Sequence, residues 1–229
     1  MDITFRSKNS RDSRRLRGSK KPPADDHIRV WTIQPLTVWQ ALEQQSPLVV
    51  DPDSSGFGAK DIEGRQAYDW MRRQMSKRIP GFGGHYPWWA YEHFLDLRFY
   101  RWHVPHIRGQ PLVRLGLDLP RDQVLLSAYG AWHCILNKCY VPEAVVGDAA
   151  ENEYVLWEDE LASSSAGVER GQSLPEPFQT QMEDSWLRVF DVDARRPSET
   201  IQACFERLSL TDVVAVEHFV SQQKTYGTQ

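Results

Sequence analysis

The chain has few cysteines and no long apolar segment. Its three cysteines, Cys134, Cys139 and Cys204, are an odd number without a C-x-x-C spacing. This usage argues against a disulfide scaffold and is typical of a reducing compartment. No run of about 18 apolar residues occurs, so the sequence offers no membrane-spanning helix, and its N-terminal stretch lacks the apolar core of a secretory signal. We therefore expect a cytoplasmic protein.

Motifs that mark common activities are also missing. The sequence contains no G-x-x-x-x-G-K-[ST], G-x-S-x-G, H-E-x-x-H or G-x-G-x-x-G, which disfavours a phosphate-binding loop, a nucleophile elbow and a zinc protease. Cys134 and Cys139 lack a second ligand pair at zinc-finger spacing, so we expect no metal. A cysteine nucleophile is disfavoured as well, because His133 and Cys134 are neighbours whose side chains would point about 100° apart on a helix.

Positive charge is concentrated at the N-terminus. Residues 1–21 hold eight Lys or Arg against two Asp, so this segment carries +6 while the rest of the chain carries −10. Because the segment has almost nothing apolar to bury, the sequence predicts a basic, disordered tail over residues 1–26. Contact of this tail with nucleic acid or an acidic partner, and a role as a targeting peptide, remain open alternatives.

Tryptophan is abundant, with nine residues in a chain whose aromatic content is 11%. Aromatic side chains of this kind fill cores or form stacking surfaces. The composition otherwise suits a soluble globular protein, and 229 residues can bury a substantial core.

Hydrophobic periodicity predicts an α+β domain over residues 27–229, with a mixed or antiparallel sheet and flanking helices. Residues 147–184 are acidic and rich in Ser, Gly and Pro, which predicts a long loop insertion. Strands are predicted over 28–33, 111–119 (half-buried), 122–127, 199–210 and 212–219, and helices over 35–46, 63–79 and 132–140, with 185–193 a short helix or strand.

Three segments place polar residues beside tryptophans, and we expect them to form one nucleotide pocket. They are the turn at 31–34, the segment from Trp88 to Arg98, and the pair Trp132 and His133. In the segment D-L-R, Asp96 and Arg98 point to the same side of an extended chain. Arg98 could then hold a phosphate or carboxylate that Asp96 orients, or the two could form a plain structural ion pair. The predicted substrate-binding residues are Trp88, Trp89, Asp96, Arg98, Trp132 and His133.

Eight short motifs follow one another along the chain. They are W-T-I-Q (31–34), Y-D-W-M-x-x-Q-M-x-x-R (68–78), Y-P-W-W-A-Y (86–91), D-L-R (96–98), V-L-L-S (124–127), W-H-x-x-L-N (132–137), S-W-x-R-V-F-D (185–191) and I-Q-A-x-F (201–205). Their order resembles an uncharacterised, mainly bacterial family called domain of unknown function 3841. The resemblance covers roughly residues 28–220 and leaves out the basic tail and the 147–184 segment.

The first predicted strand ends in the aromatic–Thr pair Trp31-Thr32, a helix and P-L-V-V (47–50) follow, and the chain closes with I-Q-A-C-F-E-R-L-S-L-T-D-V-V-A-V (201–216). This order is similar to that of ADP-ribosyltransferase-like domains, whose first strand binds the nicotinamide end of NAD. The resemblance implies an NAD site at Trp31, Thr32 and Gln34. It also implies a catalytic glutamate in the closing strand pair, which would stabilise the oxocarbenium ion formed as nicotinamide leaves.

Two features of this chain depart from that pattern. Trp31 stands where histidine or arginine is usual, and Gln202 and Cys204 occupy the positions expected for glutamate, which leaves Glu206 as the catalytic candidate. The functional expectation is a nucleotide-handling, NAD-dependent protein. The alternative is a non-catalytic module that binds nucleic acid or a protein partner through stacked bases and phosphates.

Overall fold

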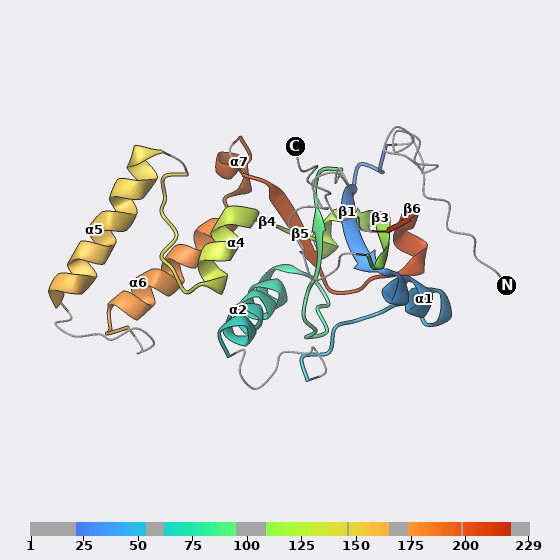
Figure 1. The fold of residues 1–229 in the computed structure, drawn as a ribbon, viewed down its shortest axis with the longest axis horizontal. Coiled ribbons are helices and arrows are strands. Elements are labelled where there is room, and N and C mark those ends of the chain that lie inside the picture. The colour runs from blue at the N-terminus through green and yellow to red at the C-terminus, as the bar shows by residue number, and fades with distance from the viewer. Residues whose placement is uncertain are drawn as a thin grey trace, which may run out of the picture.

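A six-stranded antiparallel sheet forms the centre of the protein (Figure 1). The structure, a computed structural model, describes residues 22–53, 62–94, 109–145, 147–164, 174–197 and 199–220. The strand order is β4-β5-β2-β1-β3-β6, and every neighbouring pair is antiparallel. The strands are β1 (His27–Pro35), β2 (Trp88–Tyr91), β3 (Pro111–Pro120), β4 (Leu125–Ala128), β5 (Ile201–Phe205) and β6 (Val213–Val220).

Six α-helices accompany the sheet within the described residues, so the predicted α+β class is confirmed in its antiparallel form. No helix among them is long and apolar enough to cross a membrane. In Figure 1, α1 and α5 lie at opposite ends of the molecule. The helices are α1 (Leu36–Gln44), α2 (Ile62–Arg78), α4 (Tyr129–Leu136), α5 (Asp148–Ser164), α6 (Phe178–Ser185) and α7 (Val192–Arg195).

The segment predicted as a long acidic loop is largely helical. Residues 147–184 contain α5 and most of α6. The sequence DAAENEYVLWEDELASS is rich in Ala, Glu and Leu, which favour helix, and Asp148 and Glu151 complement the positive end of the helix dipole. α5 has no buried residue, so it shows little of the apolar stripe from which a helix is recognised in a sequence.

The sheet is nearly divided between β1 and β2. β1 pairs with β3 along its whole length, whereas it pairs with β2 at one position only, where Trp31 lies opposite Tyr91. Next to that pair, the Thr32 hydroxyl donates a 2.7 Å hydrogen bond to the carbonyl of Trp89. We call this β1–β2 junction the seam; it joins the half β4-β5-β2 to the half β1-β3-β6.

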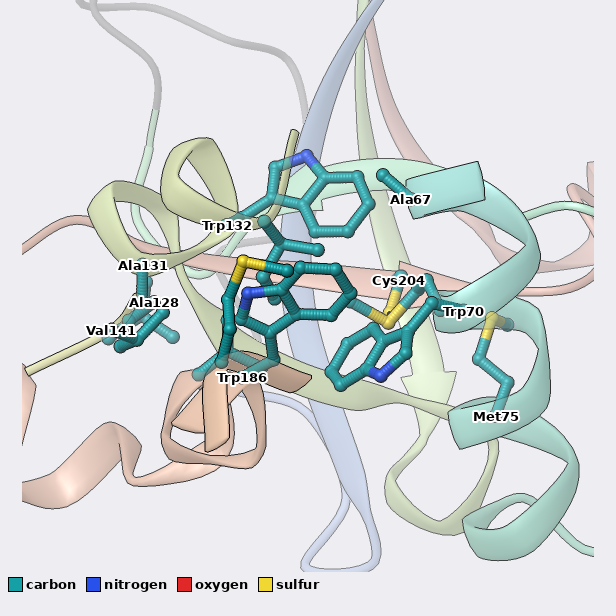
Figure 2. Packing of buried hydrophobic residues seen from close by; sticks show 14 of the residues in the cluster. Ala67, Trp70, Met75, Ala128, Ala131, Trp132, Val141, Trp186 and Cys204 are labelled. Carbon is teal, nitrogen blue, oxygen red and sulfur yellow. The ribbon is translucent and has the colours of Figure 1, made fainter. Parts of the chain in front are cut away.

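Two hydrophobic clusters cover the sheet. The first packs α2, α4 and the 3-10 helix at 186–190 against β5, with the indoles of Trp70, Trp132 and Trp186 gathered near Cys204 (Figure 2). The second packs α1 against β1 and β3 and includes Ala90 of β2 and Ala203 of β5. Because neighbouring residues of a strand point to opposite faces, we call these sides the α2 face and the α1 face.

β3 is buried on both faces, although the sequence predicts a half-buried strand. On its polar side, Arg114 forms an ion pair with Glu217 of β6 and lies over the ring of Phe94. Gly116, two residues on, leaves the space that the Trp31 ring occupies: a Cβ at this position would lie 2.8 Å from Cζ3 of Trp31. Arg114 and Gly116 thus interrupt the apolar residues of β3 because one forms an ion pair and the other makes room for a ring, not because this side of the strand faces water.

Replacing Gly116 with Ala should destabilise the fold by about 1–3 kcal/mol, because the new methyl group overlaps the Trp31 ring and cannot shift without moving β3. Chemical denaturation would measure the loss. In a Trp31→Leu background the same substitution should cost clearly less. An equal cost in both backgrounds would show that the ring contact is not the cause.

Replacing Thr32 with Val should cost about 1 kcal/mol, since the shape is kept while the carbonyl of Trp89 loses a buried donor. Thr37→Val on the exposed side of α1 serves as the matched control and should lie within about 0.5 kcal/mol of the wild type. Amide hydrogen exchange should be faster in β2 of the Thr32 variant than in β2 of the control. If exchange in β2 is unchanged, the hydroxyl does not hold the seam.

Candidate functional site

A row of four side chains crosses the middle of the sheet. Trp31 of β1 lies opposite Tyr91 of β2, Tyr91 lies opposite Gln202 of β5, and Gln202 lies opposite Ser127 of β4. Partners in an antiparallel sheet point to the same face, so the four side chains form a continuous line across the seam. We call Trp31, Tyr91, Gln202 and Ser127 the central row.

Three buried donors on this face have no hydrogen-bond partner among the described residues. They are Oγ of Ser127, Nε2 of Gln202 and Nε1 of Trp89. Ser127 is 0% exposed and Gln202 is 4% exposed. Trp89 lies two residues before Tyr91, so its side chain is on the same face and diagonal to Gln202. Buried polar groups are nearly always paired, and these three together suit a ligand that offers acceptor oxygens.

Aromatic rings lie around the same donors. Trp89 and Trp132 have ring centroids 4.8 Å apart, and Tyr68 contacts both rings edge-on. Tyr129 of α4 lies 6.1 Å from Tyr91. Such rings supply flat apolar surface for a planar ligand. The structure thus brings together Trp89 and Trp132, both predicted as substrate-binding residues.

His133, the neighbour of Trp132, is held at the surface of α4. Its Nδ1 lies 2.9 Å from the carbonyl of Tyr129, and its ring lies 4.2 Å from the Tyr129 ring. A carbonyl can only accept, so Nδ1 carries the proton and Nε2 is left as the basic nitrogen. His133 is exposed, and its role in substrate binding stays a prediction.

The predicted binding residues are divided between the two faces of the sheet. Thr32 and Gln34 lie on the α1 face, where Gln34 donates to the Thr32 hydroxyl over 2.8 Å. Trp88 packs into the α1-face cluster and donates its indole N–H to the carbonyl of Leu48. Among the described residues, these three side chains therefore do not line one pocket with Trp31 and Trp89. Their polar groups are instead used inside the protein.

Glu206, predicted as the catalytic residue, binds a neighbouring loop. Its carboxylate accepts hydrogen bonds from the backbone N–H groups of Gly83 and His85 and from Nδ1 of His85 at 2.7, 3.2 and 2.9 Å. Burial would raise the pKa of Glu206, but these hydrogen bonds outweigh it and lower the pKa below its usual value. The carboxylate is therefore ionised at neutral pH and fixes the loop, and a Cβ at position 83 would lie only 2.9 Å from its oxygen.

The cysteines of the described residues are poorly suited to nucleophilic chemistry. Burial raises the pKa of Cys134 and Cys139, and burial likewise raises the pKa of Cys204. Their thiols are therefore protonated at neutral pH. Within the described part of the chain, no group of His, Cys, Asp and Glu could hold a metal ion.

Some of the predicted site residues lie outside the described part of the chain. Two residues of the central row were not predicted from the sequence. Asp96 and Arg98 lie in the first group, as do residues 1–21 of the basic tail. Tyr91 and Ser127 were missed because their place beside Trp31 and Gln202 depends on strand register. Periodicity shows which residues of a strand share a face, but it does not show which strand pairs with which. The alternation within WWAY and LLSA was the one signal in the sequence that could have placed Tyr91 and Ser127 on that face.

Comparison with known proteins identifies one family. The family model described as Domain of unknown function (DUF3841) matches residues 29–214, which is most of the chain and includes the central row. Comparisons with curated proteins and with solved structures found no match.

Replacing Glu206 with Gln should lower stability at pH 7 by about 1–3 kcal/mol, because a charged acceptor of three hydrogen bonds becomes neutral. Since the pKa of Glu206 is lowered in the folded state, its contribution is complete above about pH 4.5 and is lost as the pH falls through the lowered value. Urea unfolding from pH 7 to pH 3 should show the difference between the two proteins shrinking below about pH 4.5.

Glu43→Gln on the exposed side of α1 is the control for this measurement, and its stability should follow the wild type at every pH. A difference for Glu206→Gln that stays constant down to pH 3 would contradict the assignment of an ionised carboxylate.

Proposed function

The chain belongs to the family described as Domain of unknown function (DUF3841), and we propose that this member binds NAD with the nicotinamide ring on the central row. The observation that carries the proposal is that Trp31, Tyr91 and Gln202 lie in register on one face, with the buried Nε2 of Gln202 lacking an acceptor among the described residues. The resemblance to ADP-ribosyltransferase-like domains supports it, because it implies a nicotinamide site on the first strand and the key residue near position 202.

The chemistry of the row suits a nicotinamide group. The ring is planar and aromatic, and Tyr91 and Trp89 offer ring surfaces two residues apart on one face, with Trp89 supported from behind by Trp132. The carboxamide carries an acceptor oxygen and an NH₂ donor. Its oxygen would accept from Nε2 of Gln202 and from the hydroxyl of Ser127, so both buried donors would gain an acceptor.

Recognition is a stronger part of the proposal than turnover. Breaking the bond between nicotinamide and ribose leaves positive charge on the ribose, which a carboxylate stabilises and a neutral amide does not. Position 202 carries an amide in this chain. Glu206 lies four residues further along, which in an extended strand is about 13 Å away, and its carboxylate binds Gly83 and His85. The proposal therefore assigns the NAD site to the row and not to Glu206.

Titration calorimetry with NAD should show saturable binding to the wild type. Tyr91→Ala and Gln202→Ala should each weaken it at least tenfold, about 1.4 kcal/mol, because one loses ring contact and the other an amide hydrogen bond. Gln40→Ala on the exposed side of α1 should bind as the wild type does. Absence of binding, or equal binding by all four proteins, would contradict the proposal.

Release of nicotinamide from labelled NAD tests the chemical step on the wild type and two further variants. We expect Gln202→Glu to release nicotinamide faster than the wild type, because the substitution places a carboxylate on the row. Glu206→Gln should match the wild type once both are shown to be folded. A loss of release in Glu206→Gln alone would instead restore Glu206 as the catalytic residue.

A further inference from the structure

A groove is lined by residues of α5 and α6 together with Tyr140 and Arg188, and none of its lining residues belongs to the central row. α5 lies at one end of the molecule (Figure 1). The groove encloses about 450 Å³. One wall is aromatic, with Tyr140 and Trp157 stacked at 5.2 Å and 15° between their planes. Carboxylates of Glu153, Glu160 and Asp184 also line the groove. Six of its nine lining residues come from the segment that the sequence predicts as a loop, and none of the nine is a predicted site residue.

The floor of the groove is built from groups that pair with one another. Glu153 accepts hydrogen bonds from the Tyr140 hydroxyl and from the backbone N–H groups of Glu143 and Ala144. Arg188 donates to the Tyr140 hydroxyl, to the carbonyl of Val141 and to Glu153. Burial would raise the pKa of Glu153, but the hydrogen bonds and Arg188 lower it overall. The floor is thus ordered before any ligand arrives.

The rim carries groups that lack partners among the described residues. Glu160 and Asp184 are exposed, and neither forms an ion pair there. Nε1 of Trp157 is buried and has no hydrogen-bond acceptor in the described part of the chain. α5 as a whole has six acidic residues and no basic one, and Leu156 on the groove is 64% exposed. The rim therefore offers negative charge and an aromatic surface, and one donor without a partner is buried in the wall beneath it.

These features select a basic polypeptide segment. An Arg or Lys side chain can lie along Leu156 and the aromatic wall while its cation meets Glu160 and Asp184, and Arg188 already lies over the Tyr140 ring at 5.2 Å in a cation–π contact. A peptide also brings backbone carbonyls, which the N–H of Trp157 requires and which a simple amine lacks.

We propose that the groove binds the basic segment 1–21 of this same chain. The charges are complementary, because this segment carries +6 and α5 carries six carboxylates. The site is independent of the NAD proposal, since none of its lining residues belongs to the central row.

Fluorescence anisotropy with a labelled peptide of residues 1–21 tests the inference on the full chain. The receptor is a variant with Arg14→Gln, Arg15→Gln and Arg17→Gln, which weakens competition from its own segment. We expect binding at about 50 mM salt that weakens as salt rises. The wild type should bind the peptide at least threefold more weakly than this receptor, because its own segment occupies the groove. No binding, or equal binding by both proteins, would overturn the proposal.

Three further variants of the receptor locate the peptide. The pair Glu160→Gln and Asp184→Asn should weaken binding at least tenfold, and Trp157→Phe should weaken it about threefold or more because the ring is kept and the N–H is lost. Glu43→Gln on α1 removes one charge at the opposite end of the molecule and should leave binding unchanged. Equal loss in the α1 control would show general charge attraction and would overturn the groove as the site.

Discussion

The seam between β1 and β2 is the constraint on which the arrangement of the sheet depends. β2 has four residues and meets the nine-residue β1 at one pair, so most of the hydrogen bonds that usually join two central strands are missing there. Two interactions take their place. The Thr32 hydroxyl donates to the carbonyl of Trp89, and the α1-face cluster runs beneath both halves through Ala90 and Ala203. The halves are thus joined mainly by packing, which has no directional requirement.

This junction explains why the central row is where it is. Trp31 and Tyr91 form the single pair across the seam, and the row continues into the other half through Gln202 and Ser127. A ligand on the row would contact side chains from both halves, so its binding energy would also hold the seam closed. Opening of the seam and release of such a ligand would then be coupled, because each favours the other.

Much of the fold could be predicted from the sequence because local patterns determine it. Alternation over 28–33 and the apolar face of 63–79 correspond to β1 and α2, and Pro35 marks the start of α1. The acidic segment 147–184 could not be predicted as helical, since α5 has no buried residue and therefore lacks the apolar stripe that marks a helix in a sequence. Burial of β3 was missed because its cover comes from β6, Phe94 and Trp31, which are distant in sequence.

In the candidate site, too, the sequence pattern gives the strands but not the contacts between them. These contacts decide which polar residues have partners inside the protein and which do not. Thr32 and Gln34, predicted from their place beside tryptophans, and Glu206, predicted from the ADP-ribosyltransferase resemblance, all have hydrogen-bond partners inside the protein. Ser127, Gln202 and Trp89 differ, because each buries a donor without a partner among the described residues. Leaving such a group unpaired costs about 1–3 kcal/mol. Three such donors on one face would regain this stability if an acceptor-bearing ligand bound there, and we base the proposed site at the central row on them more than on any motif.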